Sequence, residues 1–228
     1  NAQSRRLEEA FVRAGLPYRL VGATRFYGRR EIRDVIAYLR LVHNPADSVS
    51  LLRIINVPPR AIGAKTIDAL QEMADQQGLG PVAALERIAA GEQHPFSGRA
   101  ANALIRFSNL LTGWILRRDS LLVADLMDLI LEESGYREML HDNTPEGTER
   151  WENVLELRSV AADYPDMTLA EFLEQVALVS DVDNLTEGEG APTMLTLHAA
   201  KGLEFPIVFI VGLEDEMLPH KRSWDDPD

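Results

Sequence analysis

The sequence predicts a mostly α-helical protein whose two ends belong to the α/β class. At the N-terminal end, apolar residues recur at helical spacing over residues 4–14, and Gly15 can cap that helix before a short strand pattern over residues 16–21. At the C-terminal end, residues 193–196 form another short strand pattern, and the unbroken apolar run over residues 207–211 is typical of a strand buried on both faces of a parallel sheet. The middle shows helical periodicity, so an all-helical insertion between two α/β segments is expected.

Three helices are predicted at the start of the middle region. Apolar residues mark one face of the first, over residues 29–44, and arginines occupy its opposite side. Asp47 is a plausible N-cap for the second, which runs to about residue 55. The segment over residues 56–66 opens the third, which continues through Met73.

Further helices follow in the rest of the middle region. They are predicted over residues 81–90, from Ser97 to about Leu116, from Ser120 through Leu131, over residues 149–164, and from the capping box Thr168–Glu171 to about Val179. The acidic, glycine-rich segment over residues 181–190 is predicted to be a mobile linker that returns the chain to its α/β part.

Composition excludes several classes of protein. The sequence has no cysteine, so disulfides and thiolate metal sites are ruled out, and we expect no metal site. No apolar run approaches the length of a membrane span, and residues 1–6 lack the apolar core of a signal peptide. We therefore expect a cytoplasmic protein with no membrane partner.

Charge is unevenly distributed along the chain. A net charge of −13 argues against a generic nucleic-acid binder, which is usually basic. Residues 1–70, however, hold 12 Lys or Arg against 6 Asp or Glu, whereas residues 71–228 hold 11 against 30. This asymmetry is typical of a chain whose basic end faces phosphate, and the alternative is a solvated basic face without a ligand.

Two short segments have residues suited to binding phosphate. In the first, Thr196 and His198 can donate hydrogen bonds, Lys201 supplies a point charge, and Gly202 lets the backbone come close. In the second, over residues 56–66, a proline turn and a helix start direct free N–H groups and a lysine outward. The alternatives are an ordinary turn and an ordinary helix start.

These segments resemble motifs of the superfamily 1 DNA helicases of the UvrD, PcrA and Rep group. Thr196-Leu-His-Ala-Ala-Lys-Gly-Leu-Glu-Phe-Pro206, with Val208-Phe-Ile-Val-Gly-Leu-Glu-Asp-Glu-Met-Leu-Pro-His-Lys-Arg-Ser223 after it, resembles motif V. Phe26-Tyr-Gly-Arg-Arg-Glu-Ile-Arg-Asp-Val-Ile-Ala-Tyr-Leu-Arg-Leu41 resembles motif IVa. Residues 56–66 look like the helix-hairpin-helix-type loop that grips duplex DNA, although Ala61 stands where the family usually has glycine.

The resemblance covers essentially the whole chain and implies its domain organisation. Residues 1–24 and 191–228 would belong to the RecA-like motor domain called 2A, and residues 25–190 would be the helical insertion called 2B. The parent protein would be an ATP-dependent helicase and translocase that moves 3′ to 5′ on single-stranded DNA in repair or replication restart. Its partners would be single-stranded DNA, a duplex junction and a repair protein on the helical domain.

The resemblance also implies roles for individual residues. Thr196 and His198 would hold the tracking strand, Glu204 would contact the nucleotide ribose, and Lys201 with Gly202 would lie near its phosphates. The residues implied to contact duplex DNA are Arg60, Ile62, Gly63, Lys65 and Thr66.

The sequence lacks two parts of a complete ATP-driven motor. No Gly-x-x-x-x-Gly-Lys-Ser/Thr loop is present, because Ala64 stands where its second glycine would be. No arginine-rich segment like motif VI follows before Asp228, and the acidic residues 214–216 are expected to face solvent. The parent would use ATP and Mg²⁺, whereas this chain alone is expected to have no complete catalytic site, no bound cofactor and no ATPase activity.

Two other functions remain open at this stage. A stand-alone duplex-binding module would use the basic N-terminal third and would bind DNA less tightly as salt rises. A regulatory protein-interaction module would use the acidic helices and would capture a partner without affinity for DNA.

Overall fold

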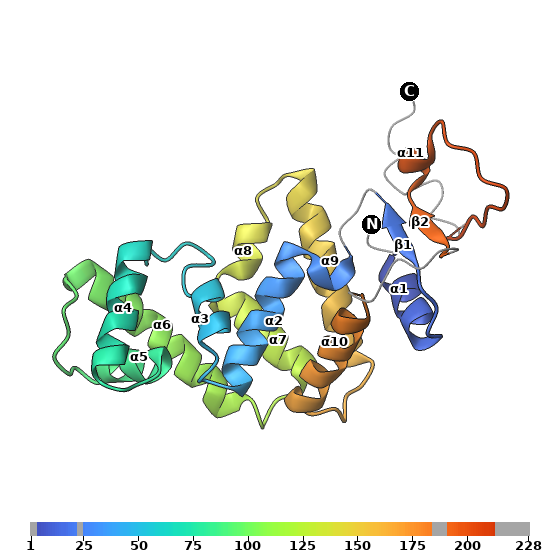
Figure 1. The fold of residues 1–228 in the computed structure, drawn as a ribbon. Coiled ribbons are helices and arrows are strands. Elements are labelled where there is room, and N and C mark those ends of the chain that lie inside the picture. Colours follow the sequence, from blue (N-terminus) through green and yellow to red (C-terminus); the bar gives the residue numbers. More distant parts are fainter. Residues whose placement is uncertain (1–3, 22–24, 184–190, 213–228) are drawn as a thin grey trace. The chain divides into compact units, whose positions relative to one another are not determined.

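The computed structural model describes residues 4–21, 25–183 and 191–212, and the chain divides into two compact units (Figure 1). One unit combines the described residues up to Arg25 with those from residue 191 onward. The other begins at Phe26 and includes the described residues up to Asp183. Helices make up most of the described residues taken together, which confirms the mostly α-helical fold class.

The first unit joins the two ends of the chain through a small parallel sheet. Its described elements are α1 (Ser4–Arg13), β1 (Arg19–Val21), β2 (Thr193–Leu195) and α11 (Leu197–Ala200). Strand β1 pairs with β2 in parallel, with Leu20 opposite Met194. Gly15 ends α1 at φ +64°, and the Leu16 N–H donates to the Phe11 carbonyl at 2.9 Å. Segments about 170 residues apart therefore lie side by side, as the strand patterns at the two ends predicted.

The predicted strand over residues 207–211 is wrong. This segment is neither strand nor helix, and the exposed fractions of its side chains run from 56% at Ile210 to 86% at Phe209. A strand requires a neighbouring strand to pair its backbone groups, and within the described residues β1 and β2 pair only with each other. Apolar side chains favour burial, but no element among the described residues packs over this segment.

The second unit is a bundle of helices packed around α2 (Arg30–His43). Most of α2 is buried, and it contacts α3, α6, α7, α9 and α10. The other elements of the unit are η1 (Phe26–Gly28), α3 (Ser48–Ile54), α4 (Ala64–Gln76), α5 (Pro81–Ala89), α6 (Gly98–Arg117), α7 (Val123–Glu133), α8 (Tyr136–Leu140), α9 (Pro145–Ala162) and α10 (Leu169–Asp183).

Capping side chains begin two of these helices where the sequence predicted, whereas Ser97 is the N-cap of α6 without a side-chain hydrogen bond. Asp47 accepts a hydrogen bond from the Ser50 N–H at 2.9 Å and starts α3. At α10, Glu171 accepts from the Thr168 N–H at 2.8 Å, and the Glu171 N–H donates to the Thr168 hydroxyl at 3.3 Å. The predicted capping box is therefore confirmed.

Other predicted boundaries differ from the structure. Helix α7 begins at Val123, because Ser120 donates to the Arg117 carbonyl and belongs to the turn that ends α6. Helix α9 begins at Pro145, one turn before the predicted start, where Thr144 caps it. The short α8 was not predicted, and α10 continues to Asp183. Residues 184–190 of the predicted linker lie outside the described residues.

Trp114 lies at the centre of the second unit. Its side chain is fully buried, and its ring forms a T-shaped pair with the ring of Tyr38, with 5.7 Å between the centroids. The indole N–H donates to Glu133 at 2.8 Å, so the polar atom of this large side chain is satisfied.

A membrane span requires a long helix of nearly continuous apolar residues, and none of the helices within residues 4–21, 25–183 and 191–212 meets this requirement.

Candidate nucleic-acid interface

The loop between α3 and α4 is folded back on the side chain of Asn56. Its Oδ1 atom accepts hydrogen bonds from the backbone N–H of Arg60 at 2.7 Å and of Ile62 at 3.2 Å. The Tyr38 hydroxyl donates to the Val57 carbonyl and fixes the first half of the loop. This segment therefore has a defined shape where it enters α4.

The first turn of α4 is open to solvent. Ile62 is fully buried and anchors the loop, whereas Gly63, Ala64 and Lys65 are exposed. Gly63 is the N-cap and carries no side chain that could accept from the first N–H groups of the helix, while the N–H of Thr66 donates to the Gly63 carbonyl at 2.9 Å. A helix N-terminus with free N–H groups and a lysine beside it is suited to binding an anion.

Arg60 points into the protein, although the sequence grouped it with the DNA-facing residues. Its guanidinium donates to the Tyr38 hydroxyl at 2.7 Å and to four backbone carbonyls at 3.0–3.3 Å. It also lies over the Phe107 ring, 5.3 Å from the centroid. Ile62 is likewise directed inward. The exposed members of the predicted duplex-binding set are therefore Gly63 and Lys65, with Thr66 half-buried.

Ala61 occupies a backbone conformation that favours glycine. Its φ is +61°, in the left-handed region, where a Cβ atom crowds the neighbouring carbonyl. Alanine in place of the family's usual glycine at this position therefore strains the backbone of the loop.

Replacing Ala61 by glycine should raise the free energy of unfolding by about 0.5–1 kcal/mol, because relief of the left-handed strain exceeds the extra entropy of the unfolded chain. Urea denaturation measures the change. Ala69→Gly, inside α4 where the backbone is helical, is the control and should lower stability instead. A loss of stability in Ala61→Gly would contradict the assigned strain.

The motif V segment, the described residues 196–212 that resemble motif V, is a second exposed candidate site and belongs to the first unit. Thr196 accepts from the Ala199 N–H at 3.2 Å and begins the short helix α11. Gly202 follows with φ +81°, and Lys201 and Glu204 on either side of it are exposed. The side chain of His198 lies outside the described part of the structure. The two predicted sites belong to different units of the chain.

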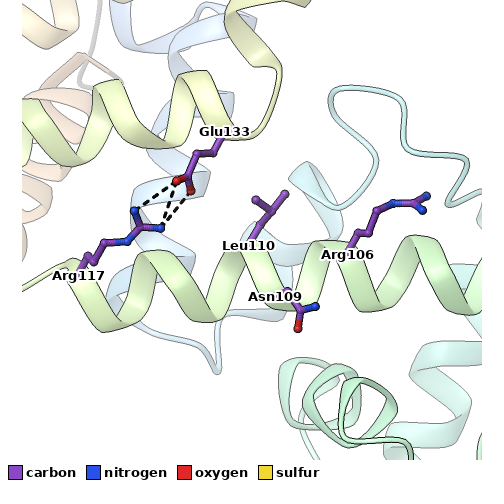
Figure 2. Close-up of a pocket in the computed structure, with 5 residues that line it drawn as sticks. All are labelled: Arg106, Asn109, Leu110, Arg117 and Glu133. Atoms are coloured by element: carbon purple, nitrogen blue, oxygen red, sulfur yellow. Dashed lines mark hydrogen bonds and ion pairs between the residues drawn. The ribbon is translucent and has the colours of Figure 1, made fainter.

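A depression lined by α6 and the last residue of α7 was not found from the sequence. It has a volume of about 540 Å³ and is lined by Arg106, Asn109, Leu110, Arg117 and Glu133 (Figure 2). Arg117 pairs with Glu133 at 3.2 Å across it, while Arg106 extends away from that pair. These residues lie on an ordinary helical surface without a motif, so the sequence carried no signal for them.

The molecule is thus an α/β unit interrupted by a helical unit, and the helical unit exposes a lysine-bearing helix start. A family model described as the UvrD-like helicase C-terminal domain matches residues 1–103 and 116–227. The chain therefore belongs to this family.

Individual relatives agree with the family match. The chain is 42% identical to the ATP-dependent DNA helicase PcrA of Bacillus subtilis over 98% of its own length and 31% of the relative. It is 43% identical to the ATP-dependent DNA helicase UvrD1 of Mycobacterium tuberculosis, over 100% of the chain and 32% of that protein. The PcrA of Staphylococcus aureus is 39% identical over 98% of the chain and 31% of its own length. The chain spans about a third of the relatives it matches.

Proposed function

We propose that this chain supplies the DNA contacts and one side of the nucleotide site of an ATP-dependent DNA helicase that moves 3′ to 5′ on single strands. Its first unit would be part of the motor domain 2A, and its second unit would be the 2B insertion. The family match supports this proposal, as does the parallel pairing of β1 with β2, because that pairing makes the helical unit an insertion within one α/β unit.

Duplex DNA would bind at the first turn of α4. The observation that carries this proposal is the exposed Gly63–Lys65 turn, whose N-cap offers no side-chain acceptor to the free N–H groups. A phosphate oxygen would accept from these N–H groups, and Lys65 would add a point charge. Such contacts recognise the backbone of DNA and carry no sequence information.

Single-stranded DNA and nucleotide would bind at the motif V segment. Thr196 and His198 would contact the tracking strand. Lys201 and Gly202 would approach the phosphates of ATP, which the parent would bind with Mg²⁺, and Glu204 would accept from the ribose hydroxyls. Lys201 and Glu204 are exposed on either side of the left-handed turn at Gly202. This fits the role, since a bound nucleotide could then meet a cation, a carboxylate and a backbone that no side chain shields. ATP would supply the free energy that drives translocation.

Lys65→Gln tests the duplex site through the salt dependence of binding. Each phosphate neutralised by a lysine releases counterions, so this change should lower the slope of log Kobs against log salt concentration by about 0.9. Fluorescence anisotropy of a labelled 20-base-pair duplex with the 228-residue chain, measured across a salt series, gives the slope.

Arg13→Gln is the matched control. It makes the same change of charge on an exposed arginine of α1, in the other unit, and should leave the slope unchanged. Equal slopes and affinities for the Lys65→Gln variant and the unaltered chain would exclude α4 as the duplex site.

A further inference from the structure

We infer that Arg60 is a positioning residue, which holds the duplex-binding turn in shape from behind and does not itself contact DNA. This inference rests on the proposed duplex site at α4. Arg60 follows Pro58 and Pro59, and its side chain is directed into the protein. From there it would determine the position of the exposed Gly63–Lys65 turn.

Most of the N–H donors of the Arg60 guanidinium already bind acceptors within the protein. Nη1 donates to the carbonyls of Ile54 at 3.0 Å, Ile55 at 3.3 Å and Pro58 at 3.2 Å. Nη2 donates to the Tyr38 hydroxyl at 2.7 Å and to the Ser134 carbonyl at 3.2 Å. A group with this many protein acceptors has little capacity left for a phosphate oxygen.

Three of the four backbone carbonyls that Arg60 binds lie at the ends of two helices. Ile54 is the last residue of α3, Ile55 is its C-cap, and Ser134 is the C-cap of α7. The last carbonyls of a helix lack partners within it and carry the negative end of the helix dipole, so a permanent cation stabilises both ends. Only a planar fork reaches carbonyls on two helices at once, and a lysine ammonium has one nitrogen.

The same residue also fixes the loop through its backbone. The Arg60 N–H donates to Asn56 beside the Ile62 N–H, and Tyr38 joins the guanidinium to the Val57 carbonyl. Ile62 then enters the core immediately before the N-cap Gly63. Loss of the guanidinium should therefore loosen the approach to α4 without removing any charge that faces DNA.

The salt dependence of duplex binding separates positioning from direct contact. Arg60→Gln should weaken binding about tenfold at every salt concentration, because the turn is less preorganised, while the slope stays that of the unaltered chain. Arg60→Lys keeps the charge and loses the fork, so it should weaken binding in the same way. A fall in slope of about 0.9 in Arg60→Gln, or full affinity in Arg60→Lys, would overturn the inference.

Hydrogen exchange tests the inference without DNA. The Arg60 and Ile62 amides should exchange faster in Arg60→Gln and in Tyr38→Phe, which removes one hydroxyl from the network and keeps the ring in the core. Thermal unfolding followed by circular dichroism shows which variants are folded. Unchanged exchange of both amides in the folded Tyr38→Phe variant, together with unchanged duplex affinity, would overturn the inference. If the unaltered chain does not bind duplex at all, the proposed duplex site fails, and the exchange rates still decide the role of Arg60.

Discussion

Replacing Trp114 by alanine is expected to lower the free energy of unfolding by about 3–5 kcal/mol. The side chain is fully buried among the helices of the second unit, packs edge-on against Tyr38 and donates to Glu133. Its removal leaves a cavity that the surrounding helices cannot close completely, and the lost van der Waals contacts add to the lost burial of apolar surface. Urea denaturation followed by far-UV circular dichroism measures the effect.

Leu116→Ala is the matched control for this prediction. Leu116 lies on the same helix, two residues away, and 78% of it is exposed. Its replacement should change the free energy of unfolding by less than about 0.5 kcal/mol. A loss of under about 1 kcal/mol in Trp114→Ala would mean that the bundle is not packed around this residue.

Replacing Glu204 by alanine in a full-length motor that contains this chain is expected to slow ATP turnover about 10- to 100-fold. The proposed hydrogen bonds of this carboxylate to the ribose involve a charged group, and each is worth about 1.5–3 kcal/mol. Glu204 is exposed beside the left-handed turn at Gly202, so its removal should leave the fold intact. Steady-state ATP hydrolysis in the presence of single-stranded DNA is the measurement.

Two further measurements make the Glu204 prediction specific. Binding of single-stranded DNA without nucleotide should change little, because Thr196 and His198 are the residues proposed to hold the strand. Glu174→Ala removes an exposed carboxylate from α10 and should leave ATP turnover unchanged. Turnover in Glu204→Ala equal to that of the unaltered motor would remove Glu204 from the nucleotide site.

Local signals were sufficient to predict much of the fold. Helix α2 has an apolar face along its length, and α10 has a capping box at its start, so each was specified by residues within or next to the helix itself. The strand patterns at the two ends also predicted where β1 and β2 would form, and their parallel pairing follows from the α/β class of both ends. Predictions based on periodicity and caps succeeded because tertiary packing agreed with them.

The failures came from features that depend on distant residues. The direction of the Arg60 side chain is set by acceptors as far away in sequence as Ser134, which no local pattern reveals. Helix α8 has five residues, too few to show a period. Residues 207–211 have the composition of a buried strand, but burial requires a neighbouring strand that the described residues do not provide. At the candidate nucleic-acid interface, the motif over residues 56–66 indicated the exposed turn. It could not show that Lys65 faces solvent whereas Arg60 and Ile62 point into the protein.

Hydrogen exchange of the 228-residue chain with and without a short duplex can show whether duplex DNA binds the first turn of α4. We expect slower exchange of the amides of Gly63, Ala64 and Lys65 when duplex is added, since these N–H groups would then donate to phosphate. In Lys65→Gln this protection should be smaller. Protection confined to other helices, with unchanged exchange at these three amides, would show that duplex does not bind at this turn.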